Sequence, residues 1–133
     1  MKRTGLLIVA AAFTFAACGG RATALKEYGE VMDAATKKVT EIAAELKVAK
    51  DGKAVAAAIT KFADAMQDMK VKGDALDKKH NLKMKGDEMP AELKPKFDAL
   101  MAASKALSEG PLMEALKKYS TDPEVEAALK KLQ

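Results

Sequence analysis

The side chains best suited to metal chemistry lie close together near the middle of the chain. His80, Met84 and Met89 fall within ten positions, and an imidazole with two thioethers is a ligand set that suits Cu(I). The structural alternative is that His80 caps the end of a helix while the two methionines fill irregular space over the core, as methionine often does. The sequence favours the structural interpretation and leaves a copper site as a hypothesis.

A haem site of the kind found in b-type four-helix cytochromes needs one methionine and one histidine on facing helices. Met32 and His80 are the candidates on the apolar stripes of this chain. If the first hairpin turns at residues 51–52, His80 lies level with about residue 23, and the two ligands are about 13 Å apart along the bundle at 1.5 Å per residue. This offset argues against a shared iron, so we expect no bound cofactor.

Groups that carry out catalysis are few. The chain has one histidine and one cysteine, whereas zinc and di-iron sites in helical bundles use several histidines or Glu-x-x-His pairs. No phosphate-binding glycine loop occurs, and no acidic residue interrupts the apolar stripes. We therefore expect that the protein is not an enzyme.

The one cysteine, Cys18, follows a segment with the order of a secretory signal. Lys2 and Arg3 precede an apolar run over residues 5–17 that ends in small residues, as in signal peptides. The run is shorter than the ~20 residues that span a bilayer. The segment Phe15-Ala16-Ala17-Cys18 resembles the lipobox of bacterial lipoproteins, with phenylalanine where leucine is usual. The resemblance covers residues 1–20.

This resemblance implies a location. Residues 1–17 would be a lipoprotein signal peptide, Cys18 the lipidated first residue of the mature chain, and residues 18–21 a short tether to a domain over residues 22–133. The protein would be anchored in the bacterial cell envelope, and Gly19 after the cysteine favours the outer membrane facing the periplasm in a Gram-negative cell. The alternative is an ordinary secreted protein with a free thiol.

Composition indicates a helical domain with little net charge. The chain has 23 basic and 19 acidic residues, and loss of Lys2 and Arg3 leaves 21 against 19, or about +2. This balance gives no indication of nucleic-acid binding. Alanine, lysine, leucine and glutamate dominate and tryptophan is absent, a composition that favours helices.

Two long apolar stripes predict two long helices, because their steps alternate between three and four residues as in a heptad repeat. The first stripe is Leu25, Tyr28, Met32, Ala35, Val39, Ile42, Leu46 and Ala49. The second is Val55, Ile59, Phe62, Met66, Met69, Gly73 and Leu76, and it extends to His80. Between them, we expect Gly52 to end the first helix in a left-handed conformation.

The third stripe predicts a helix that is interrupted. Its members are Leu93, Phe97, Leu100, Ser104 and Leu107, after which the pattern resumes at Leu112, Leu116 and Tyr119. Pro90 and Pro95 suit its first turn, whereas Gly110 and Pro111 predict a break or kink. We expect Met101 and Met113 to lie in the core with Met66 and Met69.

The predicted fold is an all-α antiparallel helical bundle of three main helices, the third broken near Gly110 and Pro111, plus a short C-terminal helix. A capping box from Thr121 to Glu124 opens this last helix. We expect the domain to be a binding or structural interaction module with a protein partner, or to self-associate through its long heptad helices. A periplasmic carrier of copper or haem is the alternative.

Lysines gather where the second helix ends, which an antiparallel hairpin places beside the lipid anchor. They are Lys70, Lys72, Lys78, Lys79, Lys83 and Lys85, and with Asp74 and Asp77 they give residues 70–85 a charge of +4. Lysines near an anionic membrane contribute about 1 kcal/mol each to its attraction. We therefore expect these lysines to contact lipid headgroups; the alternative is an ordinary solvated face.

Replacing Cys18 tests the predicted anchor. Cys18→Ala removes the thiol that would carry the lipid, so the chain should leave the membrane fraction and be left uncleaved or cleaved at another site. Fractionation of cells and mass spectrometry of the N-terminus measure both effects. Normal processing and membrane association of Cys18→Ala would show that the lipobox interpretation is wrong.

Overall fold

The computed structural model describes residues 6–81 and 89–132, with side chains described from residue 20 onward. These residues form helices joined by short turns and include no strand, so the predicted all-α class is confirmed. The elements are α1 (Leu6–Val48), α2 (Gly52–His80), α3 (Lys94–Leu107), the π-helical turn η2 (Ser108–Leu112), α4 (Met113–Tyr119), α5 (Pro123–Leu129) and the 3-10 turn η3 (Lys130–Leu132).

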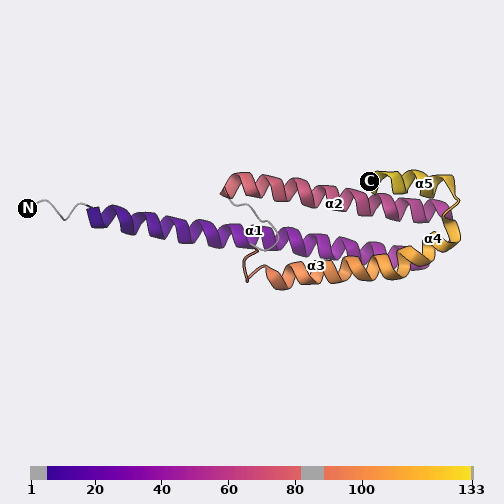
Figure 1. Cartoon of the computed structure of the whole chain (residues 1–133), viewed down its shortest axis with the longest axis horizontal. Helices are drawn as coiled ribbons and strands as arrows, with labels where there is room; N and C mark the ends of the chain where they lie inside the picture. Colours follow the sequence, from indigo (N-terminus) through magenta and orange to yellow (C-terminus); the bar gives the residue numbers. More distant parts are fainter. Residues whose placement is uncertain (1–5, 82–88, 133) are drawn as a thin grey trace, which may run out of the picture.

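Helix α1 is the axis of the bundle. In Figure 1, α2 returns antiparallel along one side of α1, and α3 runs along the other side in the same direction as α1. The most extensive contacts in the molecule are those of α1 with α2 and with α3. The short helix α5 folds back and packs on α2 near the first turn (Figure 1). Along the chain α1, α2, α3 and α5 therefore alternate in direction, and α5 covers only part of α2.

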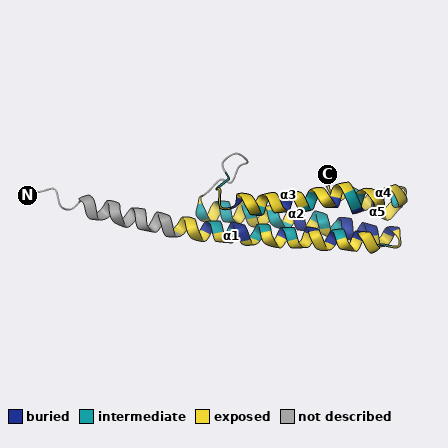
Figure 2. Ribbon diagram, turned by 90° about the horizontal axis from the view of Figure 1, so that it is seen from below, coloured by how far each residue is buried: buried dark blue, intermediate teal, exposed yellow. Residues whose placement is uncertain are grey.

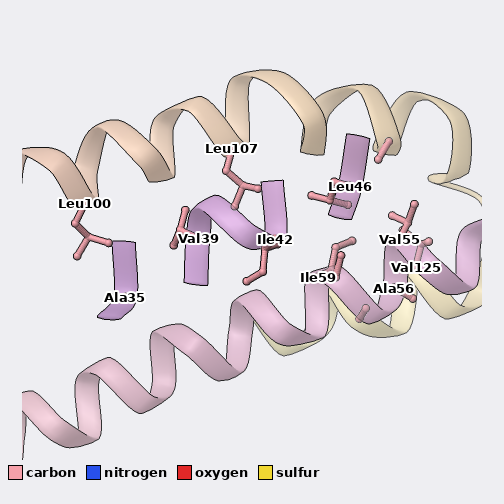
Figure 3. Close-up of a cluster of buried hydrophobic side chains, with 13 residues drawn as sticks. Ala35, Val39, Ile42, Leu46, Val55, Ala56, Ile59, Leu100, Leu107 and Val125 are labelled. Carbon is pink, nitrogen blue, oxygen red and sulfur yellow. The ribbon is translucent and has the colours of Figure 1, made fainter. Parts of the chain in front are cut away.

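The first two stripes form the interface between α1 and α2, as their heptad spacing predicts. Every residue of these stripes is buried or half-buried, and the buried positions follow the inner side of the hairpin (Figure 2). In Figure 3, Val39 and Ile42 of α1 meet Ile59 of α2 and Leu107 of α3 in one apolar cluster. Removal of this surface from water, at roughly 25 cal/mol per Å², stabilises the hairpin and the helix that packs on it.

The turn between α1 and α2 lies where the sequence predicts it, but Gly52 does not end α1 in a left-handed conformation as expected. Gly52 is the first residue of α2, and Asp51 is its N-cap, accepting a hydrogen bond at 2.8 Å from the backbone N–H of Ala54. Gly52 is needed for a close approach, because a Cβ atom there would come within 2.0 Å of an oxygen of Asp122. The left-handed residue is instead Asn81, with φ of 51°, after the end of α2.

The third helix passes Gly110 and Pro111 without breaking. It begins at Lys94, has Pro95 in its first turn, and continues through the π-helical turn η2 into α4. A π-helical turn is wider than an α-helical one because its hydrogen bonds join residues five apart, and Pro111, which has no backbone N–H, lies within this turn. The predicted break is therefore a local change of helix type, with the Pro111 ring buried in it.

The prediction that Met101 and Met113 lie in the core is wrong, since their residues are 53% and 49% exposed. Met101 follows the buried Leu100, which packs in the core with residues of α1. Neighbours in sequence point about 100° apart around a helix, so Met101 is turned away from α1. Nor does α2 cover it, because α2 and α3 make few direct contacts.

The C-terminal helix starts one residue later than the capping box predicts. Asp122, and not Thr121, is the N-cap of α5, and its carboxylate accepts a hydrogen bond at 2.9 Å from the N–H of Glu124. Val125 and Ala128 are the buried residues of α5, in the same cluster as the apolar residues of α2.

Truncating one core side chain and one exposed side chain, in separate variants, tests which side of each helix is buried. Ile42→Ala should lower the free energy of unfolding by about 2–5 kcal/mol, because Ile42 is buried between three helices and the truncation leaves a cavity. Met101→Ala should change it by no more than about 0.5 kcal/mol, since surface substitutions remove little packing. Urea denaturation measures both, and equal losses would contradict the observed phase of the stripes.

Candidate functional site

A polar cluster joins α1 and α2 at the end of the hairpin where α2 terminates. Glu27 receives two contacts from α2: Lys79 Nζ lies 2.6 Å from Glu27 Oε1, and His80 Nε2 lies 2.6 Å from Glu27 Oε2. Beside them, the Tyr28 hydroxyl donates a hydrogen bond to the Asp77 carboxylate. The sequence analysis identified Lys79 and His80 and missed Glu27, their common partner.

The electrostatics of this cluster favour a charged Glu27 and a neutral Tyr28. The hydrogen bonds from His80 and then Lys79 hold the pKa of Glu27 below its ordinary value, because they stabilise the carboxylate. Burial raises the pKa of the Tyr28 hydroxyl, and the hydrogen bond to Asp77 raises it further. Tyr28 therefore remains a donor to Asp77 throughout the physiological pH range.

The observed pairing also corrects the alignment of the hairpin. His80 lies level with Glu27, one helical turn from the expected level of residue 23. With His80 level with Glu27, the offset between Met32 and His80 shortens to five residues, or about 7.5 Å at 1.5 Å per residue. Glu27 contacts Nε2 of His80. This atom is one of the two ring nitrogens through which a histidine can bind a haem iron or a copper ion.

Of the three proposed copper ligands, the structure describes His80 and Met89. His80 is paired with Glu27, and Met89 packs against the apolar cluster of Ala24, Tyr28 and Leu93. Met84 lies outside the described residues. Over residues 20–81 and 89–132, no three His, Cys, Asp or Glu side chains converge as a metal site would require. The copper site stays a hypothesis.

The predicted membrane-facing lysines divide into paired and unpaired residues. All four described lysines are exposed. Lys72 contacts Asp68 at 2.9 Å and Lys79 contacts Glu27, whereas Lys70 and Lys78 form no ion pair with a residue that the structure describes. Lys83 and Lys85 lie outside the described residues. The acids of α1 at this end of the bundle reduce the local excess of positive charge that residues 70–85 show on their own.

Cys18 lies within α1, whose bounds are Leu6–Val48, so the backbone predicted as a tether is helical. Nothing is described of the Cys18 side chain. A search of the described residues for a helix long and apolar enough to cross a membrane finds none.

A groove that the sequence analysis missed runs along the face shared by α1 and α2. It consists of two adjoining hollows of about 400 and 450 Å³, which have Lys38, Ala65 and Asp68 in common. Only residues of these two helices line it. The apolar part of the first hollow is formed by Val31, Ala34, Ala35, Ala65, Met69, Ala75 and Leu76.

Three ion pairs cross from α1 to α2 along this face. They are Glu27 with Lys79 at 2.6 Å, Lys38 with Asp68 at 3.1 Å, and Glu45 with Lys61 at 2.8 Å. Lys72 adds a second contact to Asp68, and these two lysines hold the pKa of Asp68 below its ordinary value. Such exposed pairs contribute little to stability, so we assign the stability of the hairpin to its core and its alignment to the ion pairs.

The groove exists because small side chains stand between these ion pairs. Ala34 on α1 and Ala65 and Ala75 on α2 lie beside the main stripes, where longer side chains would fill the space. The signal in the sequence is a second row at heptad spacing beside each main stripe, in which small apolar residues lie among charged ones. That row is easily taken for a solvated surface, because its charges dominate its composition.

Comparisons of the chain with protein-family models, with curated proteins and with solved structures give no match.

Neutralising Glu27 tests the polar cluster through its pH dependence. Because the pKa of Glu27 in the fold is lowered from 4.5, its contribution to stability is complete above that pH and is lost as the pH falls through the lowered value. Glu27→Gln should therefore show a smaller fall in Tm below pH 4.5 than the native chain, with Glu124→Gln as the exposed control outside the cluster. Identical acid profiles for all three proteins would contradict the pairing.

Proposed function

We propose that the protein is a lipid-anchored component of the bacterial cell envelope whose helical bundle is a non-enzymatic binding or structural interaction module. The observation that carries this proposal is the continuity of α1. The helix that contains Cys18 is also the helix on which α2 and α3 pack. An anchor at Cys18 would thus be joined to the bundle by helical backbone.

A continuous α1 gives the bundle a defined reach. From Gly20 to Val48 the helix extends about 42 Å at 1.5 Å per residue. The end of the bundle that carries the first turn, α4 and α5 would therefore be held away from the anchored end. Such a rod suits a role in which distance from the membrane matters. Lys70 and Lys78 are free to face lipid headgroups at the anchored end.

The accessible surface for a partner lies outside the heptad stripe. The first stripe, which a dimer through the long helices would use, is covered by α2 and α3 of the same chain. The groove between α1 and α2 is open and has an apolar floor, with a volume in the range of about 300–1,000 Å³ that ligand sites occupy. No observation favours the copper or haem carrier over this module.

Site-specific crosslinking in cells tests the proposal. A photoreactive residue is introduced, one position at a time, at the exposed Lys37 of α1, Val71 of α2 and Met101 of α3 in the full chain, and at Ala34 in the groove. At least one position should form a defined protein adduct, and the adduct should weaken in Cys18→Ala, because a shared membrane raises the effective concentration of the partners. Absence of adducts at all four positions would contradict an interaction module.

A further inference from the structure

We propose that the groove between α1 and α2 binds a basic amphipathic helix of a partner protein. This inference rests on the proposed function and names the partner by its chemistry. The groove has an apolar floor with charged edges, the form that takes an amphipathic helix with its apolar side inward.

The charge of the groove selects a basic partner. Its lining contains six carboxylates and three lysines, a net charge of −3, whereas residues 18–133 as a whole carry about +2. The carboxylates are Glu27, Glu30, Glu41, Glu45, Asp64 and Asp68, and the lysines are Lys38, Lys61 and Lys72. The groove is therefore an acidic strip on a domain that is otherwise basic.

Two of these carboxylates are available to a partner. Glu27, Glu45 and Asp68 are each paired with lysines of α2 or α1, and Glu30 lies 4.0 Å from Lys26. Glu41 and Asp64 face the second hollow from opposite helices and form no ion pair with any residue in the described part of the chain. A lysine or arginine of the partner placed over this hollow would contact both.

The spacing of the two hollows specifies the pattern of the partner. Ala34 marks the apolar first hollow, and Glu41 lies seven residues further along α1, or about 10 Å away. On a docked helix that runs along the groove, residues seven positions apart lie on the same face. The partner should therefore have a large apolar residue that enters the first hollow and a basic residue seven positions from it.

The same charge argues against two other occupants. A symmetric dimer through this face would place the same patch on both sides of the contact, and so bring net negative charge against net negative charge. An anionic lipid surface would be repelled for the same reason. A basic helix gains both the apolar burial and the charge complementarity, which steers association and depends on salt.

Peptide binding to the purified full chain in detergent micelles tests the proposal. The probe is a fluorescent helical peptide with leucine and lysine seven positions apart on one face, and the control peptide has the same composition with the pair on opposite faces. Fluorescence anisotropy should show saturable binding of the first peptide that weakens with salt. The charge reversals Glu41→Lys and Asp64→Lys, made together, should weaken it about tenfold or more, as should filling the hollow with Ala34→Phe.

Matched variants separate the groove from general effects. Glu124→Lys with Glu126→Lys changes the net charge by the same amount on α5, and Ala102→Phe adds the same bulk on the exposed side of α3; neither should alter binding. Equal binding of the two peptides, no binding of either, or equal losses in the α5 variant would overturn the proposal. A chain that dimerises unless Ala34→Phe is present would assign the groove to self-association instead. If crosslinks in cells arise at Met101 or Lys37 and never at Ala34, the interaction module stands and the groove proposal falls.

Discussion

The burial of one face of α1 is the constraint on which the rest of the structure depends. Val39, Ile42 and Leu46 pack at once with residues of α2 and α3, so one helix holds two neighbours that contact each other little. With a single cysteine the chain forms no internal disulfide, so this packing carries much of the stability of the fold. The residues packed with α1 in the core come from every other helix.

Apolar packing holds the helices together, whereas charge fixes how they are aligned. The stripes of α1 and α2 are made largely of aliphatic residues, and a slip of one heptad would still place apolar residues opposite one another. In the observed alignment Glu27, Lys38 and Glu45 each lie beside an opposite charge on α2. A slip of seven residues would separate each pair by about 10 Å, so the modest energy of each pair discriminates between alignments.

The sequence was informative where one physical rule acts alone. Heptad spacing predicts the α1–α2 hairpin and its core, because burial follows directly from the helical period. It does not predict that Met101 is exposed, since that depends on which sides of α3 the other helices cover. Gly110 and Pro111 predict a break or kink from sequence, whereas the structure has a π-helical turn there with Pro111 buried. The groove cannot be predicted from the stripes, because its small residues belong to two helices. Only the alignment of α1 with α2 brings these residues together.

The position of α5 has a consequence for the order in which the chain becomes complete. Its buried residues pack with Val55, Ala56 and Ile59, which lie more than sixty positions earlier in the sequence. Because synthesis proceeds from the N-terminus and partly folded chains expose apolar surface, this surface stays uncovered until α5 has left the ribosome. A chain truncated before Pro123 would retain its hairpin with an apolar strip open to proteases and chaperones. The roughly two turns of α5 thus determine whether this apolar strip is covered or exposed.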